Sequence, residues 1–130
     1  MRNFIVVTGL MLGMCVTTQT AYAARDTCKK VTIRLTNELN TRIKVLFINY
    51  YDYDKEKWRK ETIYPKQKID AGKSTTYLRN LEGVKNDKTK FEITYQRPVK
   101  GKFKSAENYH WYKSGVSVCE DAKIYQFNIR

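Results

Sequence analysis

The chain has 130 residues, of which 25 are Lys or Arg and 13 are Asp or Glu, and its net charge at pH 7 is +12. This length suits one globular domain rather than several. One histidine and three cysteines leave few side chains for zinc or thiol chemistry, and the positive charge favours anionic partners.

Residues 1–23 have the composition of a secretory signal peptide. Arg2 precedes an apolar run over residues 4–16, and a polar stretch then ends in Ala-Tyr-Ala at residues 21–23, which matches an A-x-A cleavage site. The apolar run is shorter than the roughly 20 residues that a membrane-spanning helix needs. We therefore expect export to the periplasm or the cell exterior, and a single β-rich domain over residues 24–130.

Cleavage would leave two of the three cysteines. Cys15 lies in the apolar run, and Met14 stands where lipoprotein processing needs a small residue, so we interpret Cys15 as part of the signal. Cys28 and Cys119 remain, and in an oxidising compartment they predict one disulfide that spans nearly the whole domain. Pairing between two molecules and two free thiols are the alternatives.

The mature domain would keep a strong positive charge. Removal of Arg2 leaves 24 Lys and Arg against 13 Asp and Glu, a net charge of +11. An anionic surface or an acidic exported protein would suit this charge, and peripheral contact with a membrane stays open. Export argues against nucleic acid as the physiological partner. A basic surface that serves only solubility is the alternative to any ligand.

Beyond residue 24 the apolar residues alternate with polar ones, as in half-buried β-strands. Val31, Ile33 and Leu35 show this period, and no window of 11 residues has the period of a helix. Pro65 lacks a backbone N–H and should end the strand before it. The candidate segments are 30–35, 42–53, 57–64, 74–79, 90–96, 109–113, 116–119 and 125–129, from which we expect seven or so short strands.

Strands with turn signals at fairly regular spacing predict an all-β fold, a small antiparallel β-sandwich or barrel-like domain clamped by one disulfide. The immunoglobulin arrangement fits poorly. Its two cysteines flank a tryptophan inside the domain, whereas Cys28 and Cys119 lie near the two ends and Trp58 comes 30 residues after Cys28.

Catalytic side chains are scarce, and we predict no catalytic residue, cofactor or metal. His110 is the only histidine and has no nucleophile motif around it. Asp52, Asp54 and Glu56 have the spacing that begins a calcium-binding loop, but Lys57 replaces the glycine of that loop and a later glutamate is missing. Ion pairing with the neighbouring cations is the simpler interpretation of these carboxylates.

Two segments mix cations with aromatic rings, a combination that can hold phosphates while a ring stacks on a base, a sugar or a lipid boundary. The alternative is the solvated face or the protective lysines of an edge strand. The predicted partner-binding residues are Lys55, Lys57, Trp58, Arg59, Lys60, Arg97, Lys100, Lys102, Phe103 and Lys104.

Tyrosine is the other abundant residue, with ten in the chain. One cluster spans residues 50–53 and a second surrounds Trp111. Tyrosines of this kind either recognise a partner or fill the rim of the core, and we expect the core role for most of them.

These features predict an exported, non-enzymatic binding module with a basic, aromatic-studded surface for an anionic or protein partner. One alternative is an inhibitor or immunity-type protein that blocks a secreted enzyme or toxin. Another is a protein that interacts with membranes or lipopolysaccharide.

Overall fold

The computed structural model describes residues 26–104 and 107–130, with the side chains of Tyr64 and Pro65 left aside. The expected signal peptide and Cys15 lie outside the described residues. The described part of the chain holds no helix with the length and hydropathy to cross a membrane.

The described residues form an all-β domain, as the alternating sequence predicts. Each expected segment contains a strand, and a two-residue strand at 88–89 adds to them. In chain order the strands are β1 (Cys28–Asn37), β2 (Ile43–Asp52), β3 (Lys57–Ile69), β4 (Ser74–Leu81), β5 (Lys88–Thr89), β6 (Phe91–Gln96), β7 (Tyr109–Lys113), β8 (Ser117–Val118) and β9 (Ile124–Ile129).

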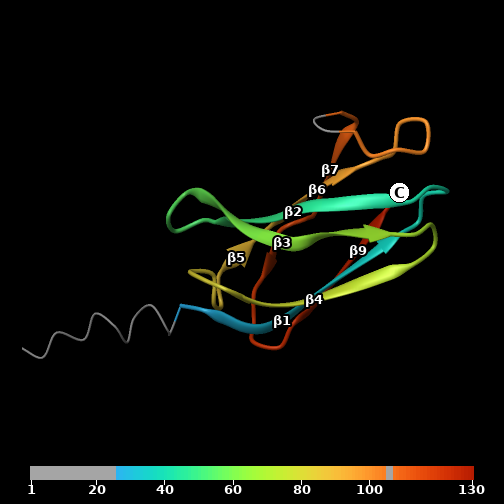
Figure 1. The fold of residues 1–130 in the computed structure, drawn as a ribbon. Helices are drawn as coiled ribbons and strands as arrows, with labels where there is room; N and C mark the ends of the chain where they lie inside the picture. Colours follow the sequence, from blue (N-terminus) through green and yellow to red (C-terminus); the bar gives the residue numbers. More distant parts are fainter. Residues whose placement is uncertain (1–25, 105–106) are drawn as a thin grey trace, which may run out of the picture.

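Two sheets form the layers of a sandwich-like fold. One sheet has the order β4-β1-β9 and the other the order β3-β2-β6-β7 (Figure 1). Strands β5 and β8 form a small third pair. The expected antiparallel pairing holds for all of these strand pairs except β1 and β9, which run parallel. The parallel pair brings the first and last strands of the domain together.

The core lies between the two sheets, because successive side chains of a strand point to opposite faces. On β1 the residues Val31, Ile33 and Leu35 are fully buried, as their spacing predicts. Phe91 on β6 packs against the rings of Tyr125 and Phe127, with ring centroids 4.7 and 5.3 Å away. These contacts join the second sheet to the last strand of the first.

The prediction that Pro65 ends its strand is wrong. β3 continues to Ile69, and the register shifts between the pair Phe47 with Thr62 and the pair Val45 with Gln67. Pro65 lies in the unpaired residues of this shift, where its missing N–H removes no ladder hydrogen bond. The strand therefore continues after the irregularity, and Lys68 pairs with Lys44 near the end of the sheet.

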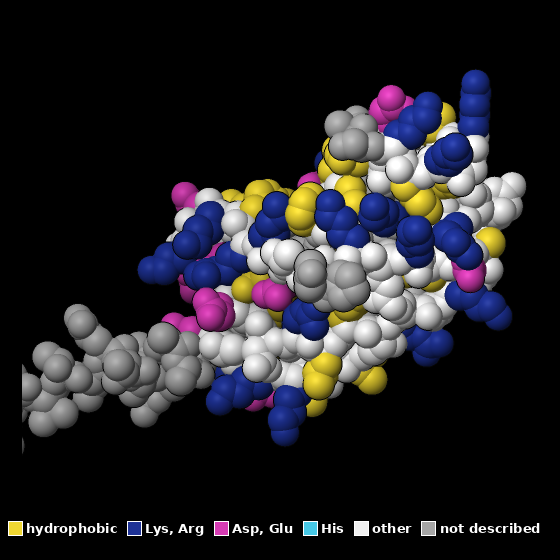
Figure 2. Space-filling view, in the orientation of Figure 1, with side chains coloured by type: hydrophobic (Ala, Val, Ile, Leu, Met, Phe, Trp, Pro, Cys, Tyr) yellow, Lys and Arg dark blue, Asp and Glu magenta, His cyan; other side chains and the backbone are white. Residues whose placement is uncertain are grey.

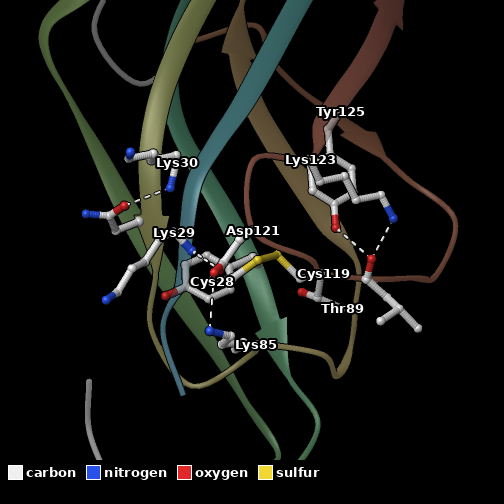
Figure 3. Close-up of a disulfide and its surroundings, with 12 residues drawn as sticks. Cys28, Lys29, Lys30, Lys85, Thr89, Cys119, Asp121, Lys123 and Tyr125 are labelled. Atoms are coloured by element: carbon white, nitrogen blue, oxygen red, sulfur yellow. Dashed lines mark hydrogen bonds and ion pairs between the residues drawn. A yellow bond between two sulfur atoms is a disulfide. The ribbon is translucent and has the colours of Figure 1, made fainter. Parts of the chain in front are cut away.

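The predicted disulfide is present between Cys28 and Cys119, which are 91 residues apart (Figure 3). Both cysteines are fully buried. Beside the bridge, the carboxylate of Asp121 accepts a hydrogen bond from the N–H of Lys29 at 2.8 Å and lies 3.2 Å from the ammonium of Lys85. The bridge and these contacts tie the start of β1 to the segment that precedes β9.

Candidate functional site

The outer surface of the β3-β2-β6-β7 sheet gathers cations and aromatic rings. Strand register and alternation place on it Lys44, Phe47, Asn49 and Tyr51 of β2, Trp58, Lys60, Thr62 and Lys68 of β3, Glu92, Thr94 and Gln96 of β6, and Tyr109, Trp111 and Lys113 of β7. We call this set the cationic-aromatic face. Glu92 is its only acid. Figure 2 shows Lys and Arg side chains in a row over β2 and β3, with hydrophobic side chains between them.

One end of this face is an aromatic cluster around a lysine. The ring of Tyr51 packs edge-on against Tyr53 and Trp58, at centroid distances of 4.8 and 5.2 Å. The ammonium of Lys90 lies 5.0 Å from the Tyr51 ring, 5.9 Å from Tyr53 and 5.5 Å from Trp58. These cation–π contacts fix the rings while leaving 45% of Trp58 exposed.

The middle of the face alternates charge with ring surface. Lys60 lies over the ring of Phe47, 3.5 Å from its centroid. Trp111 lies in the same cross-strand row as Phe47, with Thr94 of β6 between them, and is 57% exposed. A tryptophan this exposed on a paired strand offers a surface on which a partner can stack. The loss of conformational entropy on binding is small, because the strand already fixes the backbone of the tryptophan.

The other end of the face borders an open hollow of about 500 Å³. Its lining residues are Thr41, Arg42, Lys44, Lys68, Pro98, Gly101, Lys102 and Phe103. Lys44 and Lys68 are a directly opposed pair on β2 and β3, and their ammonium groups lie 5.9 and 5.5 Å from the Phe103 ring centroid. The hollow is thus strongly cationic around one aromatic ring.

A tight turn carries Lys102 to the hollow. Lys100 and Gly101 both have positive φ angles, 51° and 75°, and the backbones of Val99 and Lys102 exchange two hydrogen bonds of 2.7 and 3.1 Å. Positive φ at both central positions is the pattern of a type I′ hairpin turn, and glycine adopts it without cost. The Lys-Gly sequence therefore sets the turn that presents Lys102 and Phe103.

The buried side chain of Gln96 anchors the loop that contains this turn. Its amide nitrogen donates hydrogen bonds to the carbonyl oxygens of Lys104 and Glu107, the second at 2.9 Å. Arg97 and Asn108 add a backbone hydrogen bond of 3.1 Å at the base of the loop. Because the Gln96 amide group donates two hydrogen bonds, neither of its N–H donors is left unpaired. The two bonds fix the loop backbone at Lys104 and at Glu107.

A second pocket, of about 370 Å³, is lined by the acids Asp26, Asp52, Asp54 and Glu82 together with Lys55, Arg59 and Gly83. Its deepest carboxylate is already satisfied. Asp52 accepts hydrogen bonds from Arg59 and from the backbone N–H of Lys55, and these outweigh its burial and lower its pKa. Among the described residues no group of three or more His, Cys, Asp or Glu could hold a metal ion.

His110 faces the inner side of β7. Its ring stacks on Tyr95 with centroids 5.5 Å apart, and its Nε2 lies 2.9 Å from the side-chain oxygen of Asn108. These neighbours give the histidine a packing role at the edge of the core. Tyr50, Tyr77, Tyr95 and Tyr125 are likewise buried, and burial raises the pKa of Tyr50 and of Tyr77 to about 12.

The structure separates the predicted partner-binding residues into different places. Trp58, Lys60, Lys102 and Phe103 contribute to the cationic-aromatic face or to the hollow beside it. Arg59 points to the inner side of β3, where its guanidinium forms an ion pair with Asp52. It therefore does not contribute to the binding surface.

The remaining predicted residues surround these two places. Lys55 lines the acidic pocket, and Lys57 borders a shallow depression beside Trp58. Lys100 is exposed at the tip of the turn, and Lys104 is exposed beyond it. Arg97 is half-buried, close enough to Tyr95 for its charge to oppose the rise that burial causes in that tyrosine's pKa.

Sequence reasoning missed the cations that come from regular strands. Lys44, Lys68 and Lys113 lie outside the two segments predicted to bind a partner, and strand pairing places Lys44 opposite Lys68 and Lys113 opposite Glu92. Alternation along β2 could have placed Lys44 opposite the core-facing residues. The register shift near Pro65 interrupts the alternation along β3, so the same reasoning could not have assigned Lys68 to a face.

Comparison of the chain with protein-family models, curated proteins and solved structures finds no match.

Proposed function

We propose that this protein is an exported, non-enzymatic binding module that holds an anionic partner on its cationic-aromatic face. The observation that carries the proposal is the composition of that face, where lysines alternate with open aromatic rings and Glu92 is the only acid. Such a surface combines attraction for negative charge with ring surface for stacking.

The opposite surface of the sandwich supports this assignment by contrast. The outward residues of β1, β4 and β9 include Thr32, Thr36, Ser74, Thr76, Gln126 and Asn128, with Arg34 as the one charged residue at the paired positions. If the lysines only kept the protein soluble, we would expect a similar density of charge on the two outer faces. The unequal distribution favours a partner on the cationic-aromatic face.

The rigidity of the face favours binding without rearrangement. Its rings and cations stand on four paired strands, and the Lys90 contacts hold Tyr51, Tyr53 and Trp58 in place. A surface that is already ordered loses little conformational entropy when a partner binds. An acidic exported enzyme or toxin would be one protein partner of suitable charge.

The two tryptophans provide a direct test, because Trp58 and Trp111 both lie on this face and are the only ones in the chain. Dextran sulfate, added at low salt, should change the intrinsic fluorescence in a saturable way. Moderate salt should reverse the change, since exposed charges are screened over about 8 Å at 0.15 M ionic strength.

Matched variants identify the surface. We expect Lys60→Gln with Lys113→Gln to weaken dextran sulfate binding severalfold, because each exposed cation contributes about 1 kcal/mol or less. The control is Arg34→Gln with Lys73→Gln, which removes the same charge away from this face. Absence of polyanion binding at low salt, or equal losses in the two double variants, would contradict the proposal.

A further inference from the structure

The pair formed by Lys44 and Lys68 is unusual in this fold. Among the paired positions of the described strands, it is the one directly opposed pair in which both side chains carry charge of the same sign. Elsewhere opposed charges have opposite signs, as for Asp52 with Lys57 and Glu92 with Lys113. Like charges placed directly opposite each other destabilise a sheet.

No ion pair among the described residues offsets this repulsion. Within the described residues, neither Lys44 nor Lys68 forms an ion pair, and Lys102 lines the same hollow without one. Arg42 is the exception, because Asp70 accepts a hydrogen bond from it. The aromatic ring of Phe103 moderates the charge of the two ammonium groups above it but cannot neutralise it.

We propose that the hollow between β2, β3 and the Lys100–Gly101 turn binds a phosphomonoester group. This inference rests on the proposed function and names the group that the anionic partner would present there. A phosphomonoester carries a charge of about −1.5 to −2 at pH 7 and three strong acceptor oxygens. Lys44, Lys68 and Lys102 would supply separate ammonium donors to those oxygens, and the bound charge would remove the repulsion between the opposed pair.

A carboxylate suits the hollow less well. It carries a single charge and two oxygens in a plane, which favour the fork of one arginine over several separate ammonium groups. The one arginine at the hollow, Arg42, already donates to Asp70. Three lysines from β2, β3 and the turn approach from different elements, and this arrangement matches a tetrahedral group better than a planar one.

The phosphomonoester could belong to a soluble sugar phosphate or to a lipid headgroup. The first measurement is a titration of the full domain with glucose 6-phosphate at constant ionic strength, followed by amide and side-chain NMR shifts. Glucose and glucuronate are the comparison ligands. Saturable shifts confined to Lys44, Lys68, Lys102 and Phe103, and absent with the comparison ligands, would support the site and a soluble source.

The second measurement is sedimentation with vesicles that contain phosphatidic acid, compared with vesicles of phosphatidylcholine alone. Binding that depends on the lysines of the hollow, without a response to glucose 6-phosphate, would support the site with a lipid source. If neither probe binds through the hollow while dextran sulfate still binds the face, the phosphomonoester site is wrong and the proposed function stands. If dextran sulfate also fails, both are wrong.

Variants connect the binding to the opposed pair. We expect Lys44→Gln and Lys68→Gln each to weaken phosphate binding roughly tenfold, as for the loss of one charge-assisted hydrogen bond. In chloride buffer without ligand, Lys68→Gln should raise the melting temperature because it removes the repulsion. The double variant Arg34→Gln/Lys73→Gln should change neither quantity. A lower melting temperature for Lys68→Gln, or equal weakening in the control, would overturn the proposal.

Discussion

Nε of Arg59 donates a hydrogen bond of 2.8 Å to Oδ2 of the buried Asp52 carboxylate, and Nη2 of the same guanidinium lies 2.8 Å from that oxygen as an ion pair. The Asp52 side chain is only 1% exposed and that of Arg59 is 23% exposed. The pair joins the end of β2 to the start of β3 on the inner side of the sheet. The pair explains why Arg59, although it belongs to a predicted binding segment, stabilises the fold instead.

Removal of the arginine should therefore be costly. We expect Arg59→Gln to lower the free energy of unfolding by about 3 kcal/mol, because it leaves a buried charge without its partner. Urea unfolding monitored by tryptophan fluorescence gives this value. Asp52→Asn with Arg59→Gln should cost less than Arg59→Gln alone. A change within 0.5 kcal/mol, the size typical of ordinary surface substitutions, would show that the pair is not energetically important.

The same pair predicts how stability depends on pH. Burial alone would raise the pKa of Asp52, but its hydrogen bonds with Lys55 and Arg59 lower that pKa below its usual 3.8. A carboxyl with a lower pKa in the folded state stabilises the fold above the unfolded pKa and loses this contribution as pH falls through the folded one.

The stability difference between wild type and Asp52→Asn should accordingly be largest above about pH 4 and shrink at lower pH. Unfolding measured from pH 2 to 7 tests this. Asp87 should act in the opposite direction, since burial and its hydrogen bond with Asp54 raise its pKa. A difference that stays constant with pH would mean that Asp52 does not titrate as this geometry requires.

Gly83 stands against the same ion pair and should not accept a side chain. Its φ is +77°, and an added Cβ would lie 2.7 Å from Oδ2 of Asp52 and 2.8 Å from Nη2 of Arg59. Gly72 is the matched control, because its φ is +74° and nothing lies within 4 Å of its Cβ position. Gly72→Ala should cost about 1 kcal/mol from backbone strain alone, and Gly83→Ala clearly more. Equal melting temperatures for the two variants would contradict the close approach.

The disulfide should supply a large part of the stability. Reduction, or Cys28→Ala with Cys119→Ala, should lower the free energy of unfolding by roughly 4 kcal/mol, because the bridge closes a long loop in the unfolded chain. Calorimetry with and without a reducing agent measures the loss. If the reduced protein melts at the same temperature as the oxidised one, the bridge is not a principal stabilising element.

Gln96 offers a test of the loop beside the hollow. Gln96→Leu should keep the strand but lose both hydrogen bonds to the loop carbonyls, at a cost of about 1 to 3 kcal/mol for the unpaired groups. We expect faster amide exchange in residues 97–104 and weaker glucose 6-phosphate binding, although Gln96 does not line the hollow. Thr94→Val, on the same strand face, is the control. Unchanged exchange in the loop would show that other contacts hold it.

Much of the fold follows from local pattern, and the exceptions have identifiable causes. Val31, Ile33 and Leu35 are core residues because period-2 alternation fixes one face of a strand. The end predicted at Pro65 is wrong because a register shift tolerates a residue without an N–H. The parallel pairing of β1 with β9 joins opposite ends of the domain, and short-range sequence signals carry no information on such a contact.

The candidate site follows less completely from sequence. Trp58, Lys60, Lys102 and Phe103 are found because each stands in a run that mixes cations with aromatic residues. Arg59 belongs to the same run but takes the opposite face of its strand, where a buried acid binds it. Lys44 and Lys68 lie in separate segments outside such runs and become a site only through pairing of β2 with β3.

The sequence by itself determines the all-β class, the alternation that forms the core and the pair of cysteines that joins the two ends of the domain. These properties depend on side-chain chemistry and spacing within single segments. Only the tertiary structure decides which cations gather and which are neutralised, because charge–charge energies depend on distances between strands. It places Lys44 opposite Lys68 over one ring, and Arg59 beside Asp52 on the other side of the sheet.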